Sequence, residues 1–201
     1  MNIVNTSLPL VLALDASGKP DRWITYEDVA YYEAKDLISW KQGIENFEIR
    51  GGINAKTGLR STMDINTIVA IKGQGTSKKH GEHYNRPTLT NKALFRRDHN
   101  LCAYCGHVFP YLNLTRDHVV PTSRGGLNCW ENVVTACNGC NKHKDSRLLT
   151  EISMELKYVP YVPNRAEYLI LMNRKILSDQ MDYLLKLVKD KNSRVRHLLA
   201  A

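Results

Sequence analysis

The sequence lacks an apolar run long enough to cross a bilayer. Near its start, LPLVLAL at residues 8–14 is far shorter than the roughly 20 apolar residues of a transmembrane helix, and no basic segment precedes it as in a secretory signal peptide. Internal repeats and low-complexity blocks are also lacking, which argues against repeat arrays and disordered tracts. We therefore expect a globular protein of the cytoplasm, where cysteines serve metal or redox chemistry before disulfides.

Acidic residues are scarce relative to basic ones. The chain of 201 residues has 28 Lys and Arg against 20 Asp and Glu, so its net charge is +8 and its pI is near 9.3. This balance favours a polyanionic partner. From Lys72 to Arg97 there are seven basic residues and one acid, Glu82, so the window carries 7 − 1 = +6. The stretch fits either a solvated linker or a surface that follows a phosphate backbone.

Apolar patterning predicts an α+β fold. Residues 9–14 indicate a buried strand, and Thr25 with Asp28 three residues later is typical of a capping box, here opening a helix over about 25–37. Short β-type runs with Gly turns over 47–71 predict a small sheet packed on that helix. After Pro163 an apolar rhythm of 3.6 predicts one packing helix, or two with a break at Ser178.

Composition divides the chain into four parts. We expect an N-terminal α/β unit over 1–71, a basic linker over 72–91, a second unit over 92–148 and a C-terminal helical extension over 149–201. The oligomeric state does not follow from the sequence. One hypothesis is that the C-terminal helices form a platform for protein interaction.

Two C-x2-C pairs frame the second unit. Cys102 with Cys105 and Cys137 with Cys140 offer four thiolates, the donor set of a tetrahedral structural Zn²⁺ site with no open position. Such a site would replace part of the core that a unit of about 60 residues cannot bury. A redox C-x-x-C needs a single pair, so two pairs favour zinc over redox chemistry or disulfides. Cys129 lies outside this pattern and is interpreted as a small buried residue.

The residues between these pairs predict strand, long loop, strand and helix. LNLTRDHVVP and TSRGG (112–126) form the first strand and a turn, and WEN with VVTAC (130–137) leads to a helix that opens at the second cysteine pair. In the first strand Asp117 stands directly beside His118. Because neighbouring side chains of a strand point to opposite faces, a shared role for the two requires a local bend.

Taken together, these elements resemble the HNH endonucleases. The order C-x2-C, D-H-V-x-P, G-G, W-E-N and C-x2-C-N-x-x-K over about 95–148 is similar to the pattern of that family. The segment LVLALDASGKPDRWITYEDVAYYEAKDLISW (10–40) also resembles the leader of a group of bacterial and phage HNH proteins. The resemblance implies a ββα-metal fold held by a four-cysteine zinc and the activity of a hydrolase that cuts DNA. It also implies that the protein acts in a bacterial or phage-infected host cell.

The resemblance also implies roles for single residues. His118 would be the general base that activates water, and Asp117 would bind the catalytic Mg²⁺ or Mn²⁺, which prefer oxygen ligands. Asn132 would brace the loop that carries the histidine, and Asn141 would be the second ligand of the catalytic ion. His143, two residues later, is a rival ligand. The products would carry a 5′ phosphate and a 3′ hydroxyl.

Each residue also has a plainer interpretation. Asp117 and His118 alone fit a surface pair, Asn132 a turn and Asn141 a helix start, but their joint spacing inside the cysteine pairs favours the nuclease. An alternative function is a zinc-stabilised nucleic-acid-binding module without catalysis, which would gain nothing from the Asp117–His118 pair. Cations nearby would contact DNA phosphates or merely solvate the surface, namely Arg116, Arg124, Lys142, Lys144 and Arg147.

Overall fold

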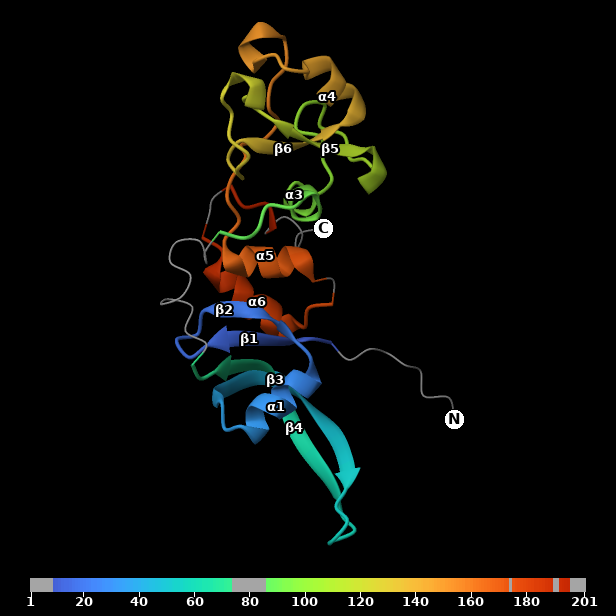
Figure 1. The fold of residues 1–201 in the computed structure, drawn as a ribbon, viewed down its shortest axis with the longest axis vertical. Coiled ribbons are helices and arrows are strands. Elements are labelled where there is room, and N and C mark those ends of the chain that lie inside the picture. The colour runs from blue at the N-terminus through green and yellow to red at the C-terminus, as the bar shows by residue number, and fades with distance from the viewer. Residues whose placement is uncertain (1–8, 74–85, 174, 190–191, 196–201) are drawn as a thin grey trace. The chain divides into compact units, whose positions relative to one another are not determined.

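The computed structural model describes residues 9–73, 86–173, 175–189 and 192–195, without the side chains of 44–46 (Figure 1). The chain divides into two compact units, the first made of Met1–Tyr84 and Asn173–Leu187 and the second of Asn85–Met172 and Val188–Ala201. The first unit combines a four-stranded sheet with helices, and the second contains a strand pair flanked by helices. This confirms the predicted α+β class. Most of the expected basic linker, 74–85, lies outside the described residues.

Unit 1 is built on a four-stranded sheet in the order β2-β1-β4-β3. β1 (Val11–Asp15) runs parallel to β4 (Arg60–Ile71), while β2 (Pro20–Ile24) and β3 (Ile38–Ile53) are antiparallel to their neighbours. The predicted first strand is therefore confirmed. β2 was not expected because its sequence reads as a turn. Pro20 is tolerated there since it stands first in an edge strand, where its missing N–H breaks no ladder.

The first helix begins where the capping pattern predicts. In α1 (Tyr26–Ala34) the Thr25 hydroxyl accepts from the Asp28 amide at 3.3 Å, and the Asp28 carboxylate accepts from the Thr25 amide at 3.0 Å. This reciprocal pair satisfies two donors that the first turn leaves open. The helix ends before the predicted residue 37 because Asp36 has a left-handed φ of 51°.

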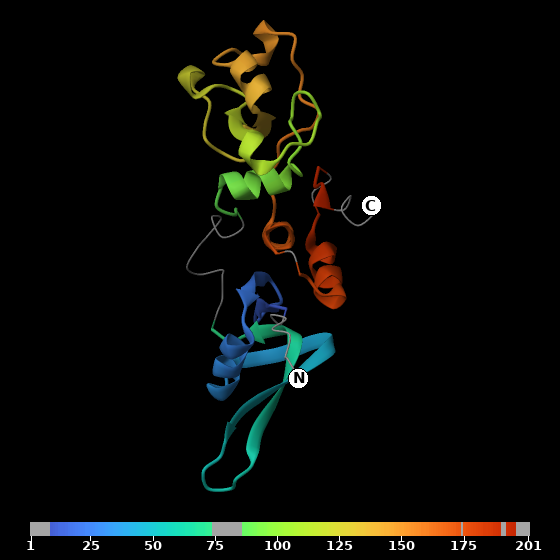
Figure 2. The same cartoon turned by 90° about the vertical axis from the view of Figure 1, so that its right-hand side faces the viewer.

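Both faces of the unit 1 sheet are buried at its strand β1. Val11 and Ala13 pack with Val29 of α1 in one apolar cluster, whereas Leu12 and Leu14 point to the opposite face and are fully buried as well. On that face lies α6 (Ser178–Leu187), which contacts β3 and β4 (Figures 1 and 2). The sheet is thus covered by one helix on each side.

Unit 2 contains the strand, loop, strand and helix that the sequence predicts between the cysteine pairs. β5 (Leu114–His118) pairs antiparallel with β6 (Val133–Cys137), and α4 (Asn138–Lys144) opens directly after β6. α3 (Asn91–Arg97) precedes this motif. Its apolar side packs against the hairpin in a cluster of Ala93, Leu94, Phe95, Leu114, Trp130 and Val133.

The C-terminal segment does not form a separate extension. Its described residues form two α-helices, α5 (Arg165–Met172) and α6, with the predicted break before Ser178. α5 belongs to unit 2 and α6 to unit 1. Side chains of α6 explain the second assignment. The Gln180 amide donates to the carbonyl of Thr67 at 2.8 Å, and the Tyr183 hydroxyl donates to the carbonyl of Gly18 at 2.7 Å.

None of the described helices combines the length and the apolar character that spanning a membrane requires.

Candidate functional site

Four cysteines converge at the base of the β5–β6 motif. The sulfur atoms of Cys102, Cys105, Cys137 and Cys140 all lie within 4.8 Å of one another. In a tetrahedral site with Zn–S bonds of about 2.3 Å, neighbouring sulfurs are roughly 3.8 Å apart, so the cluster can hold one zinc ion after small side-chain shifts. Cys129 is not part of the group, as expected.

The electrostatics of these thiols fit a cation as well. Burial acts to raise the pKa of Cys102, but the backbone amides of Cys105, Cys137 and Tyr104 outweigh it and hold that pKa below its ordinary value. At Cys140, burial and the neighbouring sulfurs of Cys137 and Cys102 raise the pKa of the thiol. Crowded sulfurs of this kind deprotonate together when a divalent ion offsets their charge.

Asp117 is buried against α4. Its side chain is 7% exposed, and the carboxylate accepts a hydrogen bond from the Tyr104 hydroxyl. The Lys144 ammonium, fully buried, lies 3.2 Å from both carboxylate oxygens. Burial and the contact with Asp117 raise the pKa of Tyr104, so this phenol remains a donor.

Lys144 connects Asp117 to the backbone of the next residue. Its ammonium donates to the carbonyl oxygen of His118 at 2.7 Å in addition to its contact with the carboxylate. A fully buried ammonium with these partners cannot reach a DNA phosphate. The expectation that Lys144 contacts DNA is therefore corrected: the side chain neutralises an internal carboxylate instead.

His118 has a different environment from Asp117. Its Nε2 lies 3.2 Å from Oδ1 of Asn128, and Arg116, two residues earlier on the same strand face, donates to that oxygen at 3.0 Å. Burial lowers the pKa of Arg116. The sequence pattern did not indicate Asn128, because an isolated Asn beside a Gly turn is ordinary loop composition.

The shared oxygen of Asn128 fixes the tautomer of His118. Arg116 can only donate, so the Asn128 atom that it meets must be the carbonyl oxygen rather than the amide nitrogen. That oxygen can only accept, and the Nε2 that contacts it must carry the proton. In the neutral ring, Nδ1 is then the nitrogen that accepts a proton.

The β5–β6 ladder shows no bend at the acid and the histidine. Five consecutive pairs run without a register shift from Leu114↔Cys137 to His118↔Val133. Asp117 and His118 therefore leave opposite faces of the strand, one towards Tyr104 and Lys144 and the other towards Asn128. The local bend that a shared role requires is not present in this conformation.

Asn132 fastens the loop that follows β5. Its side-chain oxygen accepts from the backbone N–H of Val120 at 2.9 Å. Its side-chain NH₂ donates to the backbone carbonyls of Val120 and Leu127 at 3.0 and 2.9 Å. Gly126 lies under the same loop, where a Cβ would come within 1.8 Å of the Val120 carbonyl oxygen. The G-G pair of the sequence thus contains one glycine that close packing requires.

The two candidate ligands on α4 face different surroundings. The Asn141 amide donates to the Thr115 hydroxyl at 2.9 Å, so this residue faces β5, as Lys144 does three positions later. His143 instead lines a groove of about 670 Å³ together with Cys140, Leu149 and residues 152–155. Of the two, Asn141 lies on the helix face towards the strand of Asp117.

The remaining cations near the motif are exposed, and two of them have protein partners. Arg124 pairs with Glu151 at 3.0 Å and donates to the carbonyl of Ser146, while Arg147 donates to the last carbonyls of α4. Lys142 is exposed on α4. These three side chains are placed where a phosphate can approach them.

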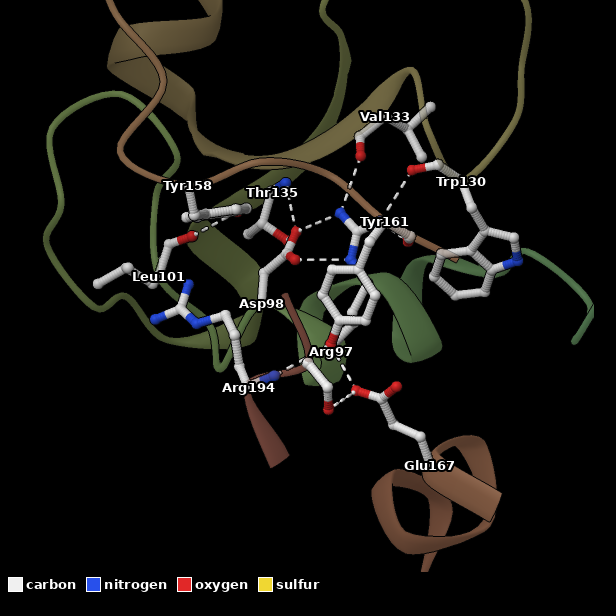
Figure 3. A network of polar contacts seen from close by, with 11 residues as sticks. Arg97, Asp98, Leu101, Trp130, Val133, Thr135, Tyr158, Tyr161, Glu167 and Arg194 are labelled. Carbon is white, nitrogen blue, oxygen red and sulfur yellow. Dashed lines mark hydrogen bonds and ion pairs between the residues drawn. The ribbon is translucent and has the colours of Figure 1, made fainter. Parts of the chain in front are cut away.

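Arg97, at the end of the basic window, is not available to a phosphate. It is fully buried and makes five hydrogen bonds, two to the Asp98 carboxylate and three to the carbonyls of Trp130, Val133 and Tyr161 (Figure 3). Asp98 in turn accepts from the amide and hydroxyl of Thr135. The expectation that the whole stretch from Lys72 to Arg97 follows a phosphate backbone is therefore wrong at its last residue.

Comparison with known proteins agrees with the motif. A scan against protein-family models matches residues 102–157 to a family described as HNH endonuclease. Searches of curated proteins and of solved structures found no match. The matched range contains both cysteine pairs, β5, β6 and α4.

Proposed function

We propose that this chain hydrolyses phosphodiester bonds of DNA with a divalent cation, because residues 102–157 match a family described as HNH endonuclease, which implies a nucleic-acid substrate. His118 is the general base. The observation that carries this assignment is the hydrogen bond from its Nε2 to Asn128, which leaves Nδ1 as the proton acceptor of the neutral ring. The imidazole is also partly exposed, so water and a phosphate can reach it.

Asp117 and Asn141 would hold the cation. Both offer the hard oxygen ligands that Mg²⁺ and Mn²⁺ prefer, and both extend into the contact between β5 and α4. When bound there, the ion would supply positive charge to the scissile phosphate. The donor types fit such an ion, provided that the Lys144 ammonium gives up its contact with the carboxylate.

Other residues have supporting roles. Arg116 donates to the Asn128 oxygen that meets His118, and Lys144 binds the Asp117 carboxylate and the His118 carbonyl. Asn132 fixes the loop that follows β5. Arg124, Lys142 and Arg147 are the exposed cations of the motif that would contact the DNA backbone. Zinc on the four cysteines would have a structural role, because four thiolates leave no position for substrate.

The closed Asp117–Lys144 pair favours a second candidate, a zinc-stabilised DNA-binding module without catalysis. In that case the ammonium would be the permanent partner of the carboxylate, and no divalent ion would be needed. The two functions differ in whether any divalent metal supports cleavage.

A plasmid-nicking assay tests the proposal. We expect the zinc-loaded full chain to nick supercoiled DNA with Mg²⁺ or Mn²⁺ and His118→Ala to lose nicking while it still binds a duplex. His107→Ala is the matched control, since His107 is exposed and is not one of the residues assigned to the site. DNA binding without cleavage under any divalent metal would favour the non-catalytic module.

The same assay distinguishes the two candidate ligands. Asn141→Ala should raise the Mg²⁺ concentration that gives half-maximal nicking, whereas His143→Ala should leave it unchanged. The reverse result would transfer the ligand role to His143.

A further inference from the structure

The strands β3 and β4 of unit 1 continue beyond the rest of their sheet as a two-stranded arm, residues 50–62 (Figures 1 and 2). Every residue of this arm is exposed. The exposed arm begins directly beside the core, because Phe47, Ile49 and Met63 at its base still pack on the apolar cluster. A ribbon with no buried face gains little stability from its own side chains, which raises the question of what its surface contacts.

The tip of the arm has a defined shape. The side-chain oxygen of Asn54 accepts from the backbone N–H groups of Lys56 and Thr57 at 2.9 and 3.2 Å. The backbone N–H of Asn54 donates to the carbonyl of Leu59 at 2.8 Å. Gly58, with a φ of +68°, completes the turn and donates to the carbonyl of Asn54 at 2.8 Å. The loop is therefore a formed turn that presents its flanking residues in fixed positions.

Two large apolar side chains flank this turn. Ile53 is 64% exposed and Leu59 is 71% exposed. Ile53 is the last residue of β3, and Leu59 directly precedes Arg60, the first residue of β4. Exposed large apolar side chains are a feature of surfaces that contact a partner.

The charge of the arm indicates what that partner is. Between residues 49 and 63 there are three cations, Arg50, Lys56 and Arg60, and no acid. Glu48 and Asp64 border this range, one on each strand. Glu48 pairs with Arg50 at 2.9 Å, but both side chains of that pair are exposed and such a pair is weak. The arm thus combines an apolar tip with positively charged flanks, which complements a polyanion.

We infer that this arm is a second contact surface for duplex DNA. The choice of DNA as the partner rests on the proposed function. A two-stranded ribbon is narrow enough to enter a groove of DNA. Proteins that enter the minor groove place apolar side chains against base steps and cations beside the flanking phosphates. Ile53 and Leu59 take the first role here, and Arg50, Lys56 and Arg60 take the second.

Fluorescence anisotropy with a labelled 30-base-pair duplex tests the inference. Every protein is the zinc-loaded full chain with His118→Ala, so that the duplex stays uncut. The arm variant replaces Arg50, Lys56 and Arg60 by Gln. We expect weaker binding and a slope of log K against log salt that falls in magnitude by about two to three, since each lost phosphate contact removes about 0.9.

A control variant makes the same change of charge elsewhere in unit 1. It replaces Lys19, Lys35 and Lys186 by Gln, which are exposed and lie off the arm. Equal loss of binding and of slope in the two variants, or no loss in either, would overturn the inference. A melting temperature equal to that of the parent chain shows that each variant is folded.

The tip is tested separately with Ile53→Ser and Leu59→Ser combined. We expect weaker DNA binding with an unchanged salt slope, and a smaller bend in a duplex that carries donor and acceptor dyes at its ends. If this variant keeps full DNA binding but converts a dimer to a monomer in light scattering, the tip contacts a second copy of the chain and the inference is wrong.

The inference and the proposed function can fail independently. Loss of DNA binding in the arm variant, together with no nicking by the parent chain under any divalent metal, would leave the arm as a DNA contact and refute the nuclease. Nicking that requires His118, together with unchanged binding by both arm variants, would support the nuclease and refute the arm as a DNA contact.

Discussion

Lys144 donates to the carbonyl oxygen of His118 at 2.7 Å while its ammonium lies 3.2 Å from the Asp117 carboxylate. One buried cation therefore holds two neighbouring residues, one through its side chain and the other through its backbone. Any cation that binds Asp117 has to share the carboxylate with this ammonium or displace it. The contact makes Lys144 a positioning residue for the pair on which the proposed chemistry depends.

Replacing Lys144 tests this relationship. Lys144→Met should lower the free energy of unfolding by about 3–5 kcal/mol, because it leaves a buried carboxylate without its partner. Millimolar Mg²⁺ should then restore part of the loss, since an ion can take the place of the ammonium. Urea unfolding with and without Mg²⁺ measures both effects.

The double variant Lys144→Met with Asp117→Asn is the control for that experiment. It removes both charges, so its loss of stability should be smaller and should not respond to Mg²⁺. Equal stabilisation of the single and double variants by Mg²⁺ would show that the ion does not bind at Asp117.

Zinc should be present at one ion per chain. Serine at Cys102 or Cys137 should release it and unfold the motif, because four thiolates contribute much of the stability of a small unit. Cys129→Ser should retain one zinc, since that residue lies outside the cluster. Metal analysis and circular dichroism provide the readouts, and full zinc retention in the Cys137 variant would contradict the assigned ligands.

Asn128→Ala should slow DNA cleavage by about tenfold, with little change in duplex affinity. The variant removes a hydrogen bond worth roughly 1–1.5 kcal/mol that sets the tautomer of His118. Single-turnover nicking measures the rate and anisotropy measures the affinity. A loss that appears entirely in binding would instead assign Asn128 to DNA contact.

Arg97→Met should destabilise the protein by about 3–5 kcal/mol, because Asp98 would remain buried without its cation. Lys92→Met on the same helix is the matched control, since Lys92 is exposed and its loss should change stability by less than about 0.5 kcal/mol. Urea unfolding distinguishes the two. Similar midpoints for both variants would show that the network of Figure 3 contributes little.

Much of the second unit could be predicted from the sequence, because its signals are local. The spacing of Cys102, Cys105, Cys137 and Cys140 predicts a common metal, and their sulfurs do meet. The strand, loop, strand and helix between them follow from alternation, turn residues and the cysteine at the helix start. Such patterns need no knowledge of contacts made by distant parts of the chain.

Other features could not be predicted because they depend on tertiary contacts. Lys144 and Arg97 were expected at the surface, as most Lys and Arg residues are, and only the partners brought by folding explain their burial. Short β-type runs over 47–71 predicted a small sheet, and β3 and β4 do lie there. The projecting arm was not predicted, because strand patterns are recognised by one buried face and residues 50–62 have none.

The division of the C-terminal segment has a practical consequence for cutting this protein into pieces. The polypeptide passes from one unit to the other at three places, near residues 84, 172 and 187. A fragment that begins at residue 85 would carry α6 away from the sheet it covers, and one that stops at residue 172 would lose Ser193, which donates to the buried Glu167 at 2.7 Å. No single break releases the intact second unit, so a domain-swap chimaera has to exchange Asn85–Met172 and Val188–Ala201 together.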